Sequence, residues 1–215
     1  MNKKTWLLII FGLLMAILLV LLLSAFGVRK RVDIAQTRGD SLYRLYGDKR
    51  VGQTFIVNED NLNIIVLDLK NSALRNKEPI YFRLEETKTA TNLREIQING
   101  RNVGDPSSIR FQFDPVSDSV GRSYYFYLES PTSTEEDAIE VYHSTQNLYS
   151  EGEMILDGQS AVGELRFVSY YYPESKKAMI GETINDLTSR FLNDKSFVFF
   201  YLILLFSVFC LSMAI

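Results

Sequence analysis

Two long apolar segments without a single charge enclose every acidic residue of this chain, and they restrict its fold more than any other feature. No Asp, Glu, Lys or Arg occurs from Thr5 to Val28 or from Ser196 to Ile215. The 26 acidic residues all lie between Asp33 and Asp194. A run of about 17 to 25 apolar residues is long enough to cross a bilayer as a helix. The sequence therefore predicts one folded middle domain between two transmembrane helices.

The first helix is expected at residues 6–27, after a cytoplasmic tail of residues 1–5. A cleaved signal peptide is the alternative, but the apolar part of a signal is usually about 7 to 15 residues long. The second helix is expected at residues 197–215, and it has no polar flank after it. The sequence therefore leaves open whether a further polytopic region follows Ile215. The basic residues on the two sides of the first block nearly balance, so charge alone does not fix the orientation.

The charge of the middle segment excludes one class of partner. Residues 32–195 contain 18 basic and 26 acidic residues. Nucleic acid requires a basic face for its phosphates, so no nucleic acid partner is expected.

Cys210, the single cysteine, lies in the second apolar block, and a disulfide within the middle is therefore not expected. The sequence also has no Asn-x-Ser/Thr sequon, which favours a bacterium or archaeon as the source.

The middle segment alternates apolar and polar residues with a period of two, which is typical of antiparallel strands. In the run from Ile109 to Phe113, for example, Ile109, Phe111 and Phe113 share one face. The run from Asp118 to Gly121 suits a tight turn between two strands, in which Gly121 is free to adopt positive φ. Nine strands follow from this pattern, and their spacing predicts an antiparallel β-sandwich or jelly roll over residues 32–173. The predicted strands are 53–57, 63–69, 80–85, 93–98, 109–113, 123–129, 139–143, 153–156 and 164–172.

A change of period after Pro173 predicts a short amphipathic helix before the second apolar block. Ile180, Ile184, Leu187 and Phe191 recur at spacings of four, three and four, so they share one helix face. The helix is expected within residues 174–195. It can lie on a bilayer surface, or it can pack on the sandwich as a connector.

Several motifs resemble an extracytoplasmic β-sandwich domain of bacterial and archaeal membrane glycosyltransferases or polysaccharide-assembly proteins. The resemblance rests on the runs FQFDP at 111–115, DSVGR at 118–122 and YYFYLESP at 124–131. GQTF at 52–55 and GELRF at 163–167 are similar to the first and last strands of that domain. The resemblance implies a sandwich on the extracytoplasmic side of the plasma membrane. It carries no catalytic residue over, because the further spans and acidic loops of the full enzymes are missing from this sequence.

Tyr125 and Tyr127 are the candidate ligand-binding residues. They alternate with Tyr124, Phe126 and Leu128, so the two sets face opposite sides of one strand. Outward tyrosines offer flat apolar surfaces to sugar rings, although aromatic cross-strand pairs also stabilise ordinary sheets.

No catalytic site is expected. A Ser-His-Asp site would depend on His143, the only histidine, which lies in a strand-like run. Adjacent acids such as Glu85 and Glu86 point to opposite faces of a strand and are poorly placed to flank one glycosidic bond. Asp114 and Asp118 are weak candidates for a calcium site, since two acids are too few. No motif for a cofactor is present.

The sequence therefore predicts a membrane-anchored, non-catalytic domain that faces glycans in cell-envelope polysaccharide assembly. Its expected partners are the lipid bilayer, an envelope glycan and a membrane protein. A two-span sensor or scaffold whose sandwich binds a protein is the alternative. If the chain is part of a longer membrane glycosyltransferase, the activity belongs to the rest of that protein.

Overall fold

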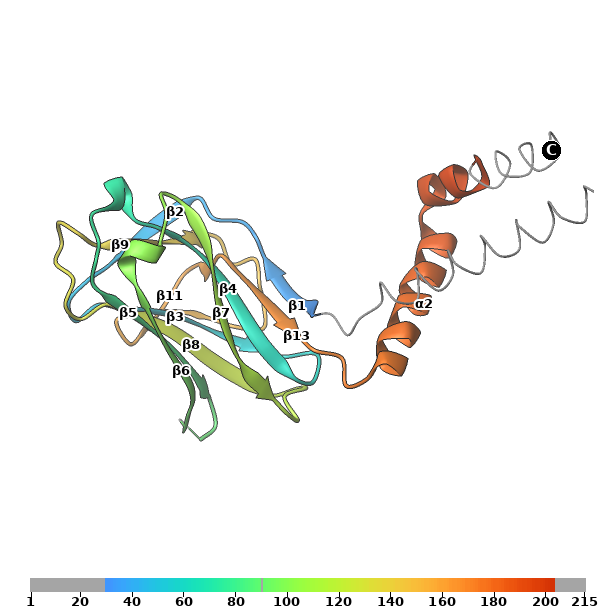
Figure 1. The fold of residues 1–215 in the computed structure, drawn as a ribbon, viewed down its shortest axis with the longest axis horizontal. Coiled ribbons are helices and arrows are strands. Elements are labelled where there is room, and N and C mark those ends of the chain that lie inside the picture. Colours follow the sequence, from blue (N-terminus) through green and yellow to red (C-terminus); the bar gives the residue numbers. More distant parts are fainter. Residues whose placement is uncertain (1–29, 90, 204–215) are drawn as a thin grey trace, which may run out of the picture. The chain divides into compact units, whose positions relative to one another are not determined.

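The structure is a computed structural model that describes residues 30–89 and 91–203. Lys30–Tyr172 form one compact unit. Within it, the described strands make two antiparallel sheets, which Figure 1 shows as two layers. The chain passes repeatedly from one sheet to the other, as in a jelly roll. The predicted antiparallel β-sandwich is therefore confirmed.

Sheet A has the order β1-β13-β4-β9-β12, with β2 paired to β9 and β7 paired to β4. Every strand pair in it is antiparallel. Its strands are β1 (Arg31–Gln36), β2 (Ser41–Leu45), β4 (Leu62–Lys70), β7 (Ser107–Val116), β9 (Ile139–Ser144), β12 (Glu164–Leu165) and β13 (Phe167–Tyr171).

Sheet B has the order β11-β10-β3-β8-β5-β6, so β8 lies near its centre with β3 on one side and β5 on the other. These pairs are also antiparallel. The strands are β3 (Arg50–Ile56), β5 (Pro79–Glu86), β6 (Thr91–Asn99), β8 (Ser123–Glu129), β10 (Met154–Leu156) and β11 (Gln159–Ala161). Two short 3-10 helices, η1 (Ser72–Leu74) and η2 (Gly100–Asn102), lie in the loops.

Each of the nine predicted strands coincides with an observed one, and the last divides at Arg166 into β12 and β13. Three short strands, β1, β2 and β11, were missed. β11 consists of only three residues, Gln-Ser-Ala, with no apolar alternation to reveal it. β1 follows a basic run, and its Val32 is 51% exposed, so its apolar face is incomplete.

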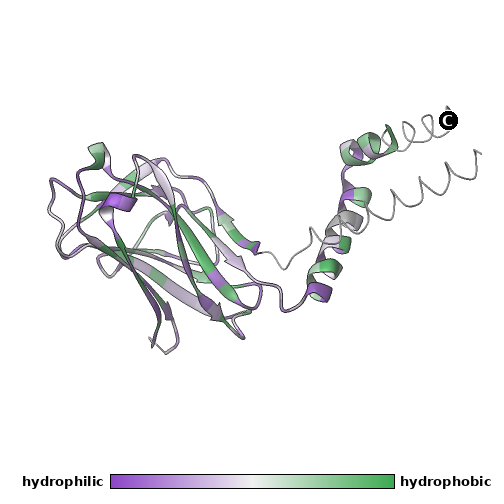
Figure 2. Cartoon of the chain, viewed as in Figure 1, coloured by the Kyte–Doolittle hydropathy of each residue, from purple (hydrophilic) through white to green (hydrophobic). Residues whose placement is uncertain are grey.

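The core between the sheets is built from aromatic and branched aliphatic side chains. On β8, Tyr124, Phe126 and Leu128 are all buried in it, which confirms the predicted inward set. The predicted inward face of β7 is also correct, since Phe111 and Phe113 belong to the core. In Figure 2 green and purple segments follow one another along the strands of the sandwich, as expected for sheets with one apolar face.

The fold-class prediction of two flanking transmembrane helices is wrong for the part of the chain that the structure describes. No helix there is both long enough and apolar enough to cross a membrane. The predicted amphipathic helix is present as α2 (Lys176–Asn193), but it carries five charged residues and is capped by Asp194. The helix that follows is described only over residues 195–203. The first apolar block at 6–27, the tail at 1–5 and residues 204–215 lie outside the described residues.

A buried polar cluster fastens three loops at one end of the sandwich. The Asn71 side-chain nitrogen donates to the carbonyl oxygens of Asn76 and Gly100, at 3.0 Å each. The Asn76 side-chain nitrogen donates to Ser133 Oγ at 2.8 Å, and its Oδ1 accepts from the Glu78 amide at 3.0 Å. Asn76 is fully buried. Two of these bonds lie within the β4–β5 loop, and the other two join it to Gly100 and Ser133 in separate loops, so the conformations of the three loops depend on each other.

The turn between β7 and β8 has the predicted geometry, since Gly121 has φ +70°. We expect Gly121→Val to lower the free energy of unfolding by about 1 to 3 kcal/mol, because positive φ is costly for a β-branched residue. A Cβ there would meet no atom within 4 Å, so the cost comes from the backbone alone. Chemical denaturation measures the effect. Gly121→Asn is the control and should retain most of the stability, because asparagine tolerates this region.

Asn76→Leu should lower the free energy of unfolding by about 2 to 4 kcal/mol, because it leaves buried polar partners without hydrogen bonds. Thermal and urea denaturation of the full chain measure this loss. Asn102→Leu is the matched control, since Asn102 is exposed in η2. Equal stability of the two variants would mean that the cluster does not fasten the loops.

Candidate functional site

The outer face of sheet B carries the two tyrosines that the sequence singles out. Strand register places Tyr127 of β8 between Gly52 of β3 and Arg83 of β5. One row further along, Glu129 lies between Arg50 and Tyr81. The opposite neighbouring row contains Thr54, Tyr125 and Glu85. Sheet pairing alone therefore gathers aromatic, acidic and basic side chains from three strands on one surface.

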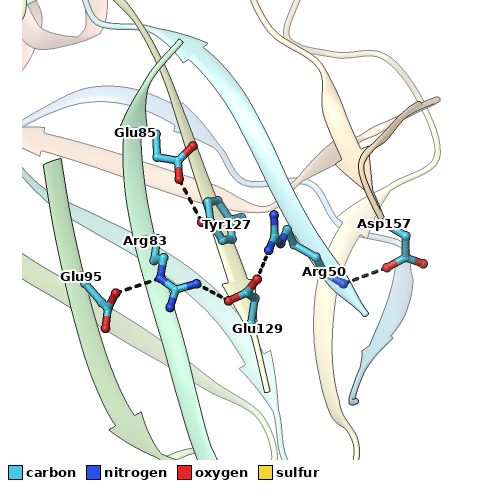
Figure 3. A network of polar contacts seen from close by, with 7 residues as sticks. All are labelled: Arg50, Arg83, Glu85, Glu95, Tyr127, Glu129 and Asp157. Atoms are coloured by element: carbon cyan, nitrogen blue, oxygen red, sulfur yellow. Dashed lines mark hydrogen bonds and ion pairs between the residues drawn. The ribbon is translucent and has the colours of Figure 1, made fainter. Parts of the chain in front are cut away.

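Glu129 is the centre of an ion-pair network on this face (Figure 3). Its two carboxylate oxygens accept hydrogen bonds from different arginines, Oε1 from Arg50 and Oε2 from Arg83. Arg83 also donates through Nε to Glu95 Oε2 at 2.8 Å. The backbone amide of Arg50 donates to Asp157 Oδ1 at 2.8 Å. Only 17% of the Glu129 side chain is exposed, so these charges are less screened than ordinary surface pairs.

Tyr127 is held inside this network and is only 5% exposed. Its hydroxyl donates to Glu85 Oε1 at 2.9 Å. The guanidinium carbon of Arg50 lies 4.5 Å from the centre of the Tyr127 ring, within the range of a cation–π contact. One ring surface is therefore already occupied by this chain's own arginine. Tyr127 lies on the outer face, as predicted, and its environment makes it a support for its neighbours.

Tyr125 is more exposed to solvent than Tyr127, and its ring lies against Gly52 of β3, which has no side chain. A Cβ built on Gly52 would be 2.6 Å from Tyr125 Cε2 and 2.8 Å from its hydroxyl oxygen. The Tyr125 and Tyr127 rings stack with their centres 5.1 Å apart and an angle of 25° between their planes. Burial raises the pKa of Tyr125 to about 12. The glycine, the stacked ring and partial burial together fix the orientation of Tyr125.

The other residues singled out by the sequence lie elsewhere. Asp114 is exposed in β7, and its carbonyl oxygen accepts hydrogen bonds from Arg94. Asp118 is exposed in the β7–β8 turn with φ +53°. Within residues 30–89 and 91–203, no group of three or more acids, histidines or cysteines is arranged to hold a metal ion. His143 lies in β9 opposite Ser41, as expected for a strand residue.

The adjacent acids of β5 are engaged by different partners. Glu85 accepts from Tyr127, whereas Glu86 lies 3.5 Å from Arg122 Nη1. This separation agrees with the expectation that neighbouring strand acids do not flank one bond.

Sequence reasoning missed Arg50, Arg83 and Glu129 as parts of this surface. Each occupies an outward position on its strand, as the alternation pattern indicates, but they lie 33 to 79 residues apart along the chain. Their association depends on which strands are neighbours, and a single sequence gives no such pairing. The only signal in the sequence was the alternation that places each of these side chains on the outer face of its strand.

No protein-family model matches the chain, and no curated protein sequence matches it either. Solved structures with a similar fold include the cysteine protease and lectin-like domains of Cwp84, a surface layer associated protein of Clostridium difficile, with 9% identity and a TM-score of 0.48. That match covers 68% of this chain and 36% of the other, so this chain spans about a third of its length.

Two carbohydrate-binding modules are also similar. One is the CBM36-1 domain of a multidomain xylanase from the hindgut metagenome of Trinervitermes trinervoides, with 9% identity, a TM-score of 0.33 and coverage of 66% of this chain and 96% of that one. The other is the CBM6cm-2 module of Cellvibrio mixtus lichenase 5A in complex with cellotriose, with 11% identity, a TM-score of 0.28 and coverage of 67% and 86%.

The raised pKa of Tyr125 gives a pH-dependent stability. Tyrosine in the unfolded chain ionises at about 10, whereas Tyr125 in the folded chain ionises at about 12. Between these values the unfolded state binds fewer protons, so the free energy of unfolding falls as pH rises. Tyr125→Phe should reduce that slope by up to about 1.4 kcal/mol per pH unit. Denaturation between these pH values measures the slope, and NMR of labelled tyrosine measures the midpoint; a Tyr125 midpoint near the unfolded value would contradict this account.

Proposed function

We propose that the sandwich is a non-catalytic glycan-binding module whose ligand-binding surface is the outer face of sheet B. The observation that carries this proposal is the fixed position of the Tyr125 ring, which lies across Gly52 and stacks on Tyr127. A ring that is already immobile loses little conformational freedom on binding. It therefore offers a preorganised flat apolar surface to the C–H groups of a sugar.

The charged groups around the ring supply the polar contacts that a sugar needs. Carboxylates accept hydrogen bonds from hydroxyl groups, and guanidinium groups donate to their oxygens. Glu85 and Glu129 provide the acceptors, and Arg50 and Arg83 provide the donors. Each group already has a partner that fixes its direction. A small number of oriented polar groups beside an apolar surface is the usual composition of a small-molecule site.

An open sheet face buries little of its ligand, so the affinity is expected to be low. We expect a dissociation constant near the millimolar end for a short oligosaccharide, or about -4 kcal/mol. Such weak binding suits a module that retains a long polymer through many repeated contacts.

We also propose a cellular location and a role for this glycan binding. The motif resemblance and the acidic, sequon-free middle segment support an extracytoplasmic position in a bacterium or archaeon. The domain would act there as an accessory to proteins that assemble cell-envelope polysaccharide. Its part is to hold the glycan, and the bond-forming chemistry belongs to a partner protein.

The test is an NMR titration of the full chain with cellotriose, chitotriose and envelope-derived glycan fragments. At least one glycan is expected to shift the Tyr125 resonances, and Tyr125→Ala should abolish the response. Tyr127→Phe retains the ring but removes the bond to Glu85, so it should weaken binding without abolishing it. Tyr142→Ala is the matched control, because Tyr142 lies in β9 of sheet A, away from the outer face of sheet B.

Two results would contradict the proposal. One is the absence of any glycan-dependent shift in a folded protein. The other is equal loss of binding in Tyr125→Ala and Tyr142→Ala. In the first case a protein ligand for this face becomes the better explanation.

A further inference from the structure

Sheet A has a hollow of about 360 Å³ that the glycan proposal does not use. Valines from two neighbouring strands, Val66 of β4 and Val168 of β13, pair directly and contribute apolar lining. Polar and charged side chains also line the hollow, including Asp68, Arg110, Arg166 and Tyr170.

Strand register explains why these side chains meet. Arg110 of β7 is opposite Val66, and Asp68 is opposite Ser108. Because strand residues two apart share a face, Val66 and Asp68 point to the same side of β4. That side is opposite the core, to which Ile65 and Leu67 contribute. Strand residues therefore form most of the hollow, and Thr37 and Arg166 from the adjoining connections complete its lining.

The single carboxylate that lines the hollow is already engaged. Asp68 Oδ2 lies 2.7 Å from Arg166 Nε, and Asp68 Oδ1 accepts from Ser108 Oγ. The Arg166 N–H does not point along a hydrogen bond, so this contact is an ion pair by proximity. Asp68 thus neutralises Arg166 and has no second charge to offer Arg110.

Two further cations have no counter-ion in the described part of the chain. Within residues 30–89 and 91–203, Arg110 makes neither an ion pair nor a hydrogen bond through its side chain. Lys30 Nζ is buried and has no hydrogen-bond partner there. It lies 5.0 Å from the centre of the Tyr170 ring, beside the hollow. Burial lowers the pKa of Lys30, and the positive charge of Arg110 lowers it further.

The charges of Lys30 and of the exposed Arg110 repel each other. The Lys30 ammonium also has no hydrogen-bond acceptor in the described residues, so an anion in the hollow would be favourable. An oxyanion in the hollow would accept charge-assisted hydrogen bonds, which are stronger than bonds between neutral groups. The planar guanidinium of Arg110 matches the spacing of oxygens in a carboxylate or phosphate. The two valines and the Tyr170 ring provide apolar surface for the remainder of such a ligand.

We propose that the hollow of sheet A is an oxyanion-binding site that takes a carboxylate or phosphate group, with Arg110 and Lys30 as its counter-charges. The group is either free or carried by an acidic sugar. This site is separate from the outer face of sheet B, and it requires an anionic group on its ligand.

The experiment is an NMR titration of the full chain, labelled on arginine and valine, with inorganic phosphate, glucuronate and glucose. Phosphate, glucuronate or both are expected to shift Arg110, Val66 and Val168, and glucose is not. Arg110→Gln should weaken anion binding at least about tenfold, because it removes a charge-assisted contact. Preference for glucuronate assigns the site to an acidic sugar, and preference for phosphate assigns it to a phosphate group.

Arg101→Gln is the matched control, since it removes the same charge from a residue of η2 that does not line the hollow and should leave binding unchanged. If Arg110→Gln does not fold, Lys30→Gln is the second variant, and the same loss is expected. No shift with either anion, equal binding of glucose, or equal weakening in Arg101→Gln would overturn the proposal. None of these results bears on glycan binding by Tyr125.

Discussion

The contact between phenylalanines of the two sheets is the interaction on which the other features depend. Phe167 of sheet A lies 5.3 Å from Phe126 and 5.7 Å from Phe55 of sheet B, measured between ring centres. Phe82 of sheet B stacks on Phe111 of sheet A at 4.5 Å. These rings bury large apolar areas and decide which face of each strand is inside. Since strand residues alternate, they also decide which residues are presented outside.

The central strand β8 links stability and recognition most directly. Its inward residues belong to the phenylalanine core, while the alternate residues Tyr125, Tyr127 and Glu129 form the outer face. A side chain on such a strand is held by the whole sheet and cannot move independently. The proposed glycan surface therefore gains its rigidity from the core beneath it, which a loop of the same composition would lack.

The sequence predicted the sandwich well because period-two alternation is a local property that each strand carries by itself. Phe111 and Phe126 were placed correctly on this basis, and Gly121 was placed correctly from the turn residues around it. The predicted transmembrane helices are the opposite case, because an apolar run gives composition and length but not the extent of a helix. In the described residues α2 ends at Asn193, and no helix is long and apolar enough to cross a membrane. The sequence could not predict the surroundings of Tyr127 either, since Arg50 and Glu85 contact it only because their strands are neighbours in the sheet.

Gly52 helps to determine the shape of the outer face of sheet B although it has no side chain to contribute to that face. A methyl group there would come within 2.4 Å of the Phe126 carbonyl oxygen and within 2.6 Å of the Tyr125 ring. Either the strands would separate or the ring would tilt away from the sheet. A saturation screen scored on ligand capture would therefore rank Gly52 with the contact residues. In a homologous chain, the residue at this position would reveal whether a flat aromatic surface exists next to it.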